Sequence, residues 1–406
     1  MKKTKRYKWT FTARFRTNAF GWKGSRLACQ RIREAVSEIK KVAHKDPLLG
    51  AEGAIKLMEK LWPALQHVDS SSGALGTAVY NATGVLIDIV AEAPVDEKTR
   101  SKWLDRLWDA FTDDGVGFLD VLGERWGDLC GSGPIASQWA DELLPIVRKT
   151  WEESKQGTFS YFRGTDACLS CLLAAERYKE LLELIASAPR ISWNYRRYGV
   201  RALVATGKKG KAIKYAQASC GLNDNPVEID RVCEEILLSS GLYDEAYRQY
   251  GLSANMGATN LSTFRNIAKK YPMKDKSEIL QDLIKSTPGE EGKWFATAKS
   301  LSLLPLALKL ALQSPCDPKT LNRAARDYLD KEPRFALGVA MASLHWLSQG
   351  WGYEITGFDV RAALHYAIEA AQKLGLEEKV RKDIKKKVAQ GKSAGMFMKD
   401  VLGEPL

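Results

Sequence analysis

The chain has 406 residues and a mass of 45.2 kDa, enough for roughly two or three ordinary domains or for one long repeat array. Hydrophobic residues make up 45% of the sequence and charged residues 27%, a globular composition that excludes a largely disordered chain. The net charge of +12 lies almost entirely in residues 1–41, where 13 lysines and arginines face two acids, so we expect an acidic partner for this segment.

Residues 1–23 are predicted to form an extended, basic and aromatic N-terminal arm. Between Arg6 and Arg16, apolar residues alternate with basic or hydroxyl residues at a period of two, the pattern of a strand with one apolar face. An isolated strand is not stable in water, so the arm either docks on the rest of the chain, pairs with an edge, or waits for a partner.

Three interpretations of the arm stay open from its residues alone. The aromatic face docks on the helices while the basic face is solvated, or the arm adds a strand to a partner protein, or it binds single-stranded nucleic acid. In the nucleic-acid interpretation, three basic residues contact phosphates and three aromatic residues stack on bases, namely Lys8, Arg14 and Arg16 and then Trp9, Phe11 and Phe15.

Residues 24–153 are predicted to form irregular helix pairs. No fixed repeat length connects these helices, which favours HEAT-like pairs, and the stretch 154–164 is the predicted seam before the next region. Amphipathic helical periodicity is clear over four stretches, 52–66, 74–93, 99–111 and 135–151.

A repeat of 34 residues is visible in the middle of the chain. Gly207 and Gly241 each end an apolar helical stretch, and Ala212 and Ala246 each lie near the start of the next one. This pattern resembles a degenerate tetratricopeptide repeat over residues 165–350. The resemblance implies stacked antiparallel helix pairs and a concave binding surface.

Three helix starts are marked by a polar residue followed by proline. A side-chain oxygen before the first turn accepts hydrogen bonds from unpaired N–H groups, and proline suits the first helical position. The predicted starts are Asn225–Pro226, Thr287–Pro288 and Asp317–Pro318.

A second basic and aromatic cluster occupies residues 193–201. On a helix, Trp193, Arg197 and Arg201 share one face. In one interpretation Tyr198 enters the core and the arginines are solvated, and in the other the arginines line a groove that grips carboxylates or phosphates. The residues predicted to contact a partner are Tyr195, Arg196, Arg197 and Arg201.

No local pattern of reactive residues predicts an enzyme. Cys168 and Cys171 form a C-x-x-C pair, but zinc would need a second pair or nearby histidines, and a thioredoxin-like role needs a preceding strand. The sequence contains neither a phosphate-binding loop nor a G-x-S-x-G motif. An enzyme would need a site assembled from distant residues such as Cys316 and His345, so we expect no catalytic residue, metal or cofactor.

The C-terminal third is predicted to contain helices over 351–390 and a loosely held tail over 391–406. Its segments 286–295, 314–318 and 352–357 are similar to the helical part of a widespread bacterial group of uncharacterised proteins. Some members of that group carry a SWIM-type zinc module, whose Cys-x-Cys and Cys-x-His pairs are absent from this chain. The resemblance implies bacterial origin and a helical array, and it implies no activity.

Together these patterns predict an all-α solenoid of stacked antiparallel helix pairs that follows a short extended arm. We expect a non-enzymatic scaffold that binds a protein partner through a concave surface and the basic arm, with nucleic-acid binding by the arm as the alternative. Seven sparse cysteines and the lack of a long apolar run predict a cytoplasmic protein with no membrane-spanning segment.

Overall fold

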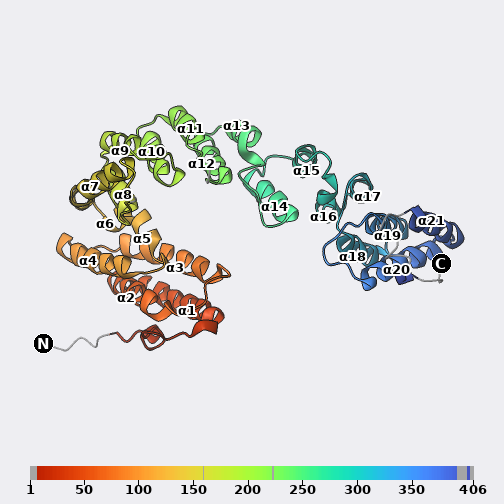
Figure 1. Cartoon of the computed structure of the whole chain (residues 1–406), viewed down its shortest axis with the longest axis horizontal. Coiled ribbons are helices and arrows are strands. Elements are labelled where there is room, and N and C mark those ends of the chain that lie inside the picture. Colours follow the sequence, from red (N-terminus) through yellow and green to blue (C-terminus); the bar gives the residue numbers. More distant parts are fainter. Residues whose placement is uncertain (1–6, 159, 222–223, 391–399, 403–406) are drawn as a thin grey trace. The chain divides into compact units, whose positions relative to one another are not determined.

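The computed structural model describes residues 7–158, 160–221, 224–390 and 400–402, and it is all-helical (Figure 1). None of these residues forms a strand, so the predicted all-α class is confirmed. The chain divides into two compact units, Met1–Ile229 and Asp230–Leu406, and the division falls inside α12 (Pro226–Leu238).

The first unit begins with two short 3-10 helices, Thr10–Ala13 and Trp22–Gly24. The α-helices that follow are α1 (Ser25–Ala43), α2 (Pro47–Leu65), α3 (Ala74–Ala91), α4 (Glu97–Asp113), α5 (Asp120–Glu124), α6 (Trp126–Cys130), α7 (Gly133–Lys155), α8 (Thr165–Ala174), α9 (Tyr178–Ala186), α10 (Trp193–Ala205) and α11 (Lys209–Gln217).

One continuous apolar core fills the first unit and extends from Trp9 to Ala202. At its centre Trp126 is fully buried, and its ring lies 5.1 Å from those of both Trp108 and Trp139. Because α8 packs against α6 and α7 within this same core, the loop 154–164 that was predicted as a seam connects two parts of one unit.

In the second unit, α16 packs against α17, α17 packs against α19, and α18, α19 and α20 pack against one another. A π-helical turn, Tyr247–Gly251, continues α13, and a 3-10 helix, Glu291–Trp294, precedes α16. The α-helices after α12 are α13 (Tyr243–Ala246), α14 (Asn260–Lys270), α15 (Lys276–Lys285), α16 (Phe295–Ser300), α17 (Leu304–Gln313), α18 (Pro318–Tyr328), α19 (Pro333–Ser348), α20 (Gly357–Lys373) and α21 (Glu377–Gln390).

Two of the three predicted helix starts are confirmed. α12 begins at Pro226 and α18 at Pro318, where an Asp317 carboxylate oxygen accepts a hydrogen bond from the Thr320 N–H at 2.9 Å. The third prediction is wrong, because no helix begins at Pro288. Gly289 there has a φ of +84°, which is incompatible with a right-handed helix, and the Thr287 hydroxyl accepts a hydrogen bond from the Trp294 indole instead of capping a helix.

One tight turn recurs at five described helix–helix connections. In each turn, one residue has a left-handed φ between +57° and +75°, and the next helix begins two positions later. The residue directly after the left-handed one donates its backbone N–H to a carbonyl oxygen at 2.8–3.0 Å. This carbonyl belongs to the residue five positions before the donor, near the end of the preceding helix, and would otherwise lack a partner. The five left-handed residues are Glu176, Gly207, Gly241, Ser302 and Gly375.

The residue five positions after each of these turns is apolar and buried. It lies in the first turns of the second helix. These residues are Leu181, Ala212, Ala246, Ala307 and Val380. The 34-residue spacing of Gly207 and Gly241 is therefore one instance of a wider structural repeat.

Within the described ranges, α3 is the one helix long and apolar enough to cross a membrane, judged by length and composition alone. Buried helices in protein cores also meet this criterion, and α3 packs against both α1 and α2. Most of the predicted loose tail, 391–399 and 403–406, lies outside the described residues, whereas Leu402 is buried.

Candidate binding pocket in the first unit

The described part of the N-terminal arm docks on α1 and α2 and forms no strand. Residues Thr10–Ala13 form a 3-10 helix, so the period-two alternation did not predict the local conformation correctly. The arm is nevertheless anchored, because the backbone N–H of Thr10 donates to a Glu38 carboxylate oxygen at 2.9 Å, and Arg14 forms an ion pair with Glu34 at 2.6 Å.

The aromatic side chains of the arm belong to the core. Trp9, Phe11 and Phe15 are 6%, 2% and 1% exposed, and Trp9 lies directly over Gly53 of α2, where an added Cβ would be 2.2 Å from the indole. Stacking on bases requires a free ring face, which none of the three offers in this arrangement. Of the basic residues assigned to phosphates, Lys8 and Arg16 are exposed, and Arg14 is paired with Glu34.

Arg197 in α10 faces the interior of the first unit. Its guanidinium forms ion pairs with Glu124 at 3.4 Å and with Asp166 at 3.2 Å, and the buried Tyr198 hydroxyl donates to Asp166 at 2.9 Å. Burial raises the pKa of Asp166 above its usual value, against the opposing effect of the Arg197 charge. The structure therefore places this arginine in ion pairs with two acids of the first unit.

The other two predicted arginines lie on separate sides of α10. Arg196 stacks over the Tyr215 ring of α11 at 5.0 Å, whereas Arg201 is exposed, with its guanidinium 5.9 Å from the Tyr198 ring. The four residues predicted to contact a partner are not brought together, and Tyr195 alone among them lines a cavity.

This cavity has a volume of about 450 Å³ and is enclosed by α7, the loop before α8, and the loop between α9 and α10. Four of its described lining residues are aromatic and five are serines or threonines, so the walls are mixed in polarity. The Trp151 and Tyr195 rings lie 5.3 Å apart on one side, and Tyr161, 71% exposed, lies at the opening. Arg190 is the single cation among the described lining residues.

Hydrogen bonds hold the loop that forms one wall of the pocket. The Ser154 hydroxyl at the end of α7 donates to the Ser160 carbonyl at 3.1 Å, and the Ser160 hydroxyl donates to a Glu153 carboxylate oxygen at 2.8 Å. Arg163 then ties the end of the loop to Asp114 at 3.0 Å. These contacts tie the described part of the loop to α7 and to Asp114.

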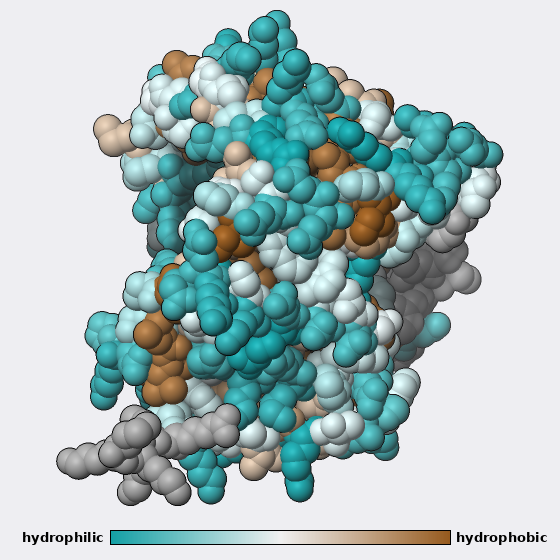
Figure 2. Space-filling model, turned by 90° about the vertical axis from the view of Figure 1, so that its left-hand side faces the viewer, coloured by the Kyte–Doolittle hydropathy of each residue, from teal (hydrophilic) through white to brown (hydrophobic). Residues whose placement is uncertain are grey.

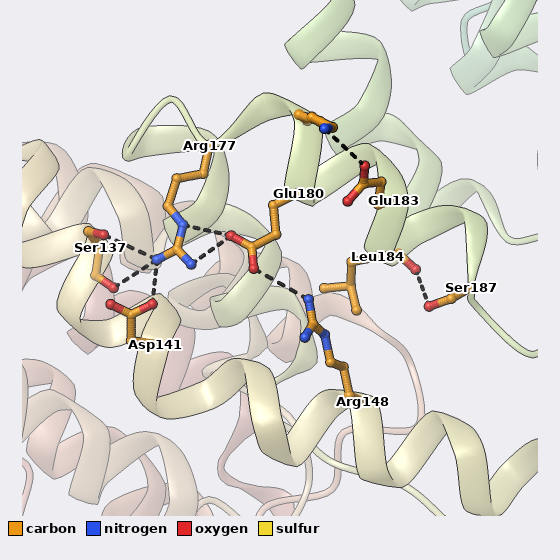
Figure 3. A network of polar contacts seen from close by, with 9 residues as sticks. Ser137, Asp141, Arg148, Arg177, Glu180, Glu183, Leu184 and Ser187 are labelled. Carbon is orange, nitrogen blue, oxygen red and sulfur yellow. Dashed lines mark hydrogen bonds and ion pairs between the residues drawn. The ribbon is translucent and has the colours of Figure 1, made fainter.

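A network of ion pairs fixes α9 against α7 beside the pocket (Figure 3). Arg177 pairs with Asp141 of α7 at 2.6 Å and with Glu180 of α9 at 2.6 Å, and Glu180 also accepts from Arg148 at 3.3 Å. This network holds α9 against α7, and both α7 and the α9–α10 connection contribute residues to the pocket.

The lining offers one guanidinium and two phenols as polar groups with defined protonation. Arg190 is exposed and forms no ion pair with a described residue, so its guanidinium is available to a carboxylate or phosphate. Burial raises the pKa of both Tyr195 and Tyr161 above the usual tyrosine value, so both phenols are neutral hydrogen-bond donors at physiological pH. None of the described lining residues is a histidine, cysteine or carboxylate.

The cysteine pair of α8 lies in the core. Cys168 and Cys171 are fully buried, and burial raises the pKa of Cys168 to about 12, so the thiol is protonated and poorly nucleophilic. The Cys171 sulfur lies 4.0 Å from that of Cys130. Across the described part of the chain, no cluster of three His, Cys, Asp or Glu residues is arranged to hold a metal ion.

Three important lining residues, Trp151, Tyr161 and Arg190, were missed by sequence analysis. They come from a helix end and two loops, and only the fold brings them beside Tyr195. The aromatic residues within the glycine-containing loop 154–164 are the sequence signal that could have pointed to a lining role for this loop.

Surface polarity does not single out the site. On the side of the molecule that carries α4 and α7, hydrophobic residues form small separate patches among hydrophilic ones (Figure 2). No protein-family model matches the chain, and neither a curated protein nor a solved structure is similar to it. The fold and the pocket therefore carry the functional argument.

Proposed function

We propose that the protein is a non-enzymatic, cytoplasmic helical-repeat scaffold that binds a segment of a protein partner in the Tyr195 pocket. In this proposal the helices stack as antiparallel pairs, as in an α-solenoid. The recurrent turn supports the stacking, since it closes five connections with the same hydrogen bond and the same buried position.

The observation that carries the binding proposal is the placement of four aromatic lining residues in one pocket with the exposed Arg190 guanidinium, which forms no ion pair with a described residue. Aromatic side chains bury large areas at low cost in conformational entropy, and arginine binds carboxylates through two parallel hydrogen bonds. The pocket therefore fits an apolar or aromatic side chain of a peptide next to a carboxylate. Its lack of a described group that titrates near neutral pH supports binding rather than catalysis.

Peptide selection tests this proposal. Random 12-residue peptides displayed on phage are selected against the full chain, and the enriched peptides are measured by fluorescence anisotropy with the wild type and with Arg190→Ala and Tyr195→Ala. We expect an acidic residue beside an aromatic one in the enriched peptides, and a loss of affinity of about tenfold in each variant.

The matched control is Lys102→Ala, which removes an exposed cation of α4 away from the pocket and should leave affinity unchanged. If the enriched peptides bind all variants equally, the pocket is not the contact site. If no peptide is enriched, the peptide-binding proposal fails.

A further inference from the structure

We infer that a groove between α1 and α3 binds an acidic amphipathic helix of a partner protein. The inference extends the proposed function, because it adds a second contact surface for a protein partner. This surface shares no residue with the Tyr195 pocket, so the two sites can fail independently.

α1 and α3 pack against each other (Figure 1), and residues of both helices line the groove. Its volume is about 870 Å³, nearly twice that of the Tyr195 pocket. Its floor is apolar and built from small or branched side chains, among them Val36, Ala78 and Val85. A floor of this kind lets another helix approach closely.

The apolar residues of α3 that line the groove are not all covered by the chain. The groove follows α3 from Ala74 to Val85, about three helical turns. Within this stretch Ala78 and Val85 are half-buried and Ala74 is exposed, so each keeps apolar area in contact with solvent. A groove lined in this way offers apolar area for a partner to cover.

The rim of the groove on α1 is basic and is not neutralised within the chain. Arg33, Lys40 and Lys41 line it, and none of them forms an ion pair with another described residue. The two acids of α1 are used elsewhere, since Glu34 pairs with Arg14 and Arg31, and Glu38 accepts hydrogen bonds from Thr10. Both acids of α1 are therefore engaged by the arm or by Arg31, and neither forms an ion pair with the three cations of the groove rim.

An apolar floor beside a cationic rim favours an acidic amphipathic helix as the bound partner segment. Strand addition needs a sheet edge, and no described residue is in a strand, so main-chain pairing with an extended peptide is not available. A helix satisfies its own backbone and lays its apolar stripe into such a groove. Glutamates or aspartates that flank the stripe would then meet the three cations.

The test uses an 18-residue fluorescent peptide designed as an amphipathic helix, with a leucine and alanine stripe flanked by glutamates. Its control has every glutamate replaced by lysine. We expect the acidic peptide to bind the full chain at least tenfold more tightly than the basic one, and its affinity to fall with increasing salt. Equal binding of the two peptides overturns the inference.

Two variants locate the binding. Ala78→Trp fills the groove and should weaken binding of the acidic peptide at least tenfold. The triple variant Arg33→Glu, Lys40→Glu and Lys41→Glu should reverse the preference so that the basic peptide binds better. Unchanged binding in either variant also overturns the inference.

Two controls separate this inference from its competitors. Circular dichroism and unchanged binding of peptides selected for the Tyr195 pocket show that the variants are folded and that the pocket is independent. Vesicles of phosphatidylserine and phosphatidylcholine test a membrane instead of a helix. If vesicles bind through the same three cations while the acidic peptide does not bind, the surface recognises lipid and the inference is wrong.

Discussion

The docked arm and α10 both interleave aromatic and basic side chains, but they place them differently. In the arm, Trp9 and Phe15 enter the core and the basic residues stay at the surface. In α10, Arg197 turns inward to Asp166, whereas Tyr195 lines an open pocket. The comparison teaches that residue types alone do not assign a binding face, because the packing of neighbouring helices decides which side chains remain accessible.

The largest expected effect concerns the arm. Phe15→Ala removes a ring that is 1% exposed and should lower the free energy of unfolding of the first unit by about 3–5 kcal/mol. Tyr195→Ala, at the half-buried pocket wall, should cost only about 1 kcal/mol. Urea denaturation followed by circular dichroism measures both. A smaller loss for Phe15→Ala than for Tyr195→Ala would contradict the docked arm.

The second prediction compares two arginines of α10. Arg197→Ala leaves the Asp166 carboxylate without its ion-pair partner and should lower the free energy of unfolding by about 2 kcal/mol. Arg201→Ala removes an exposed side chain and should change it by less than about 0.5 kcal/mol. The same denaturation experiment distinguishes them, and similar losses in the two variants would remove the structural role of Arg197.

The third prediction concerns pH. Hydrogen bonds from Gln30 and Arg31 hold the pKa of Glu34 below its usual value of 4.5, so Glu34 stabilises the folded state above pH 4.5, and this contribution is lost as the pH falls. Burial raises the pKa of Asp166 above 3.8, so its ionisation destabilises the fold as the pH rises above 3.8.

Glu34→Gln and Asp166→Asn should therefore change the pH dependence of stability in opposite directions. Glu34→Gln weakens the decline of stability on acidification, and Asp166→Asn steepens it. Thermal melting between pH 3 and pH 6 records the slopes, and slopes that shift in the same direction would show that one of the two environments is wrongly described.

The smallest expected effect tests nucleic-acid binding by the arm. The three aromatic residues predicted to stack on bases are buried, and Arg14 is paired with Glu34. Of the six residues predicted to bind nucleic acid, only Lys8 and Arg16 are therefore exposed and without an ion pair to a described residue. If a single-stranded oligonucleotide binds, the double variant Lys8→Ala and Arg16→Ala should reduce the slope of log affinity against log salt by roughly 1.4. Absence of binding at 20 mM salt would end this alternative.

Much of the fold was predictable because helical periodicity and caps are local signals. The stretches 74–93 and 135–151 correspond to α3 and α7, and Asp317–Pro318 begins α18 as predicted. The helix start predicted at Thr287–Pro288 was wrong because the left-handed backbone conformation of Gly289 does not continue into a helix. The predicted extended conformation of the arm was wrong. Its alternating aromatic residues pack on α1 and α2, and a period of two in the sequence does not distinguish such a docked segment from a strand.

The site was less predictable because it depends on residues that are distant in sequence. Tyr195 was identified from its cluster, but Arg190 and Trp151 become relevant only when α7 and the α9–α10 loop face each other. The sequence signal for the α1–α3 groove was weaker. It consists of two small residues one helical turn apart, Ala74 and Ala78, in a helix whose other residues have the pattern of a core helix.

The recurrent turn has an evolutionary consequence. Each turn is closed by a hydrogen bond between residues only five positions apart, so the bond lies within one helix pair. Such a pair contacts the rest of the chain mainly through the side chains of neighbouring helices. Duplication or deletion of a segment such as 208–241 would thus begin and end at equivalent geometry. A gene for such a chain can change in length by whole modules, and the turns mark where the joins would fall.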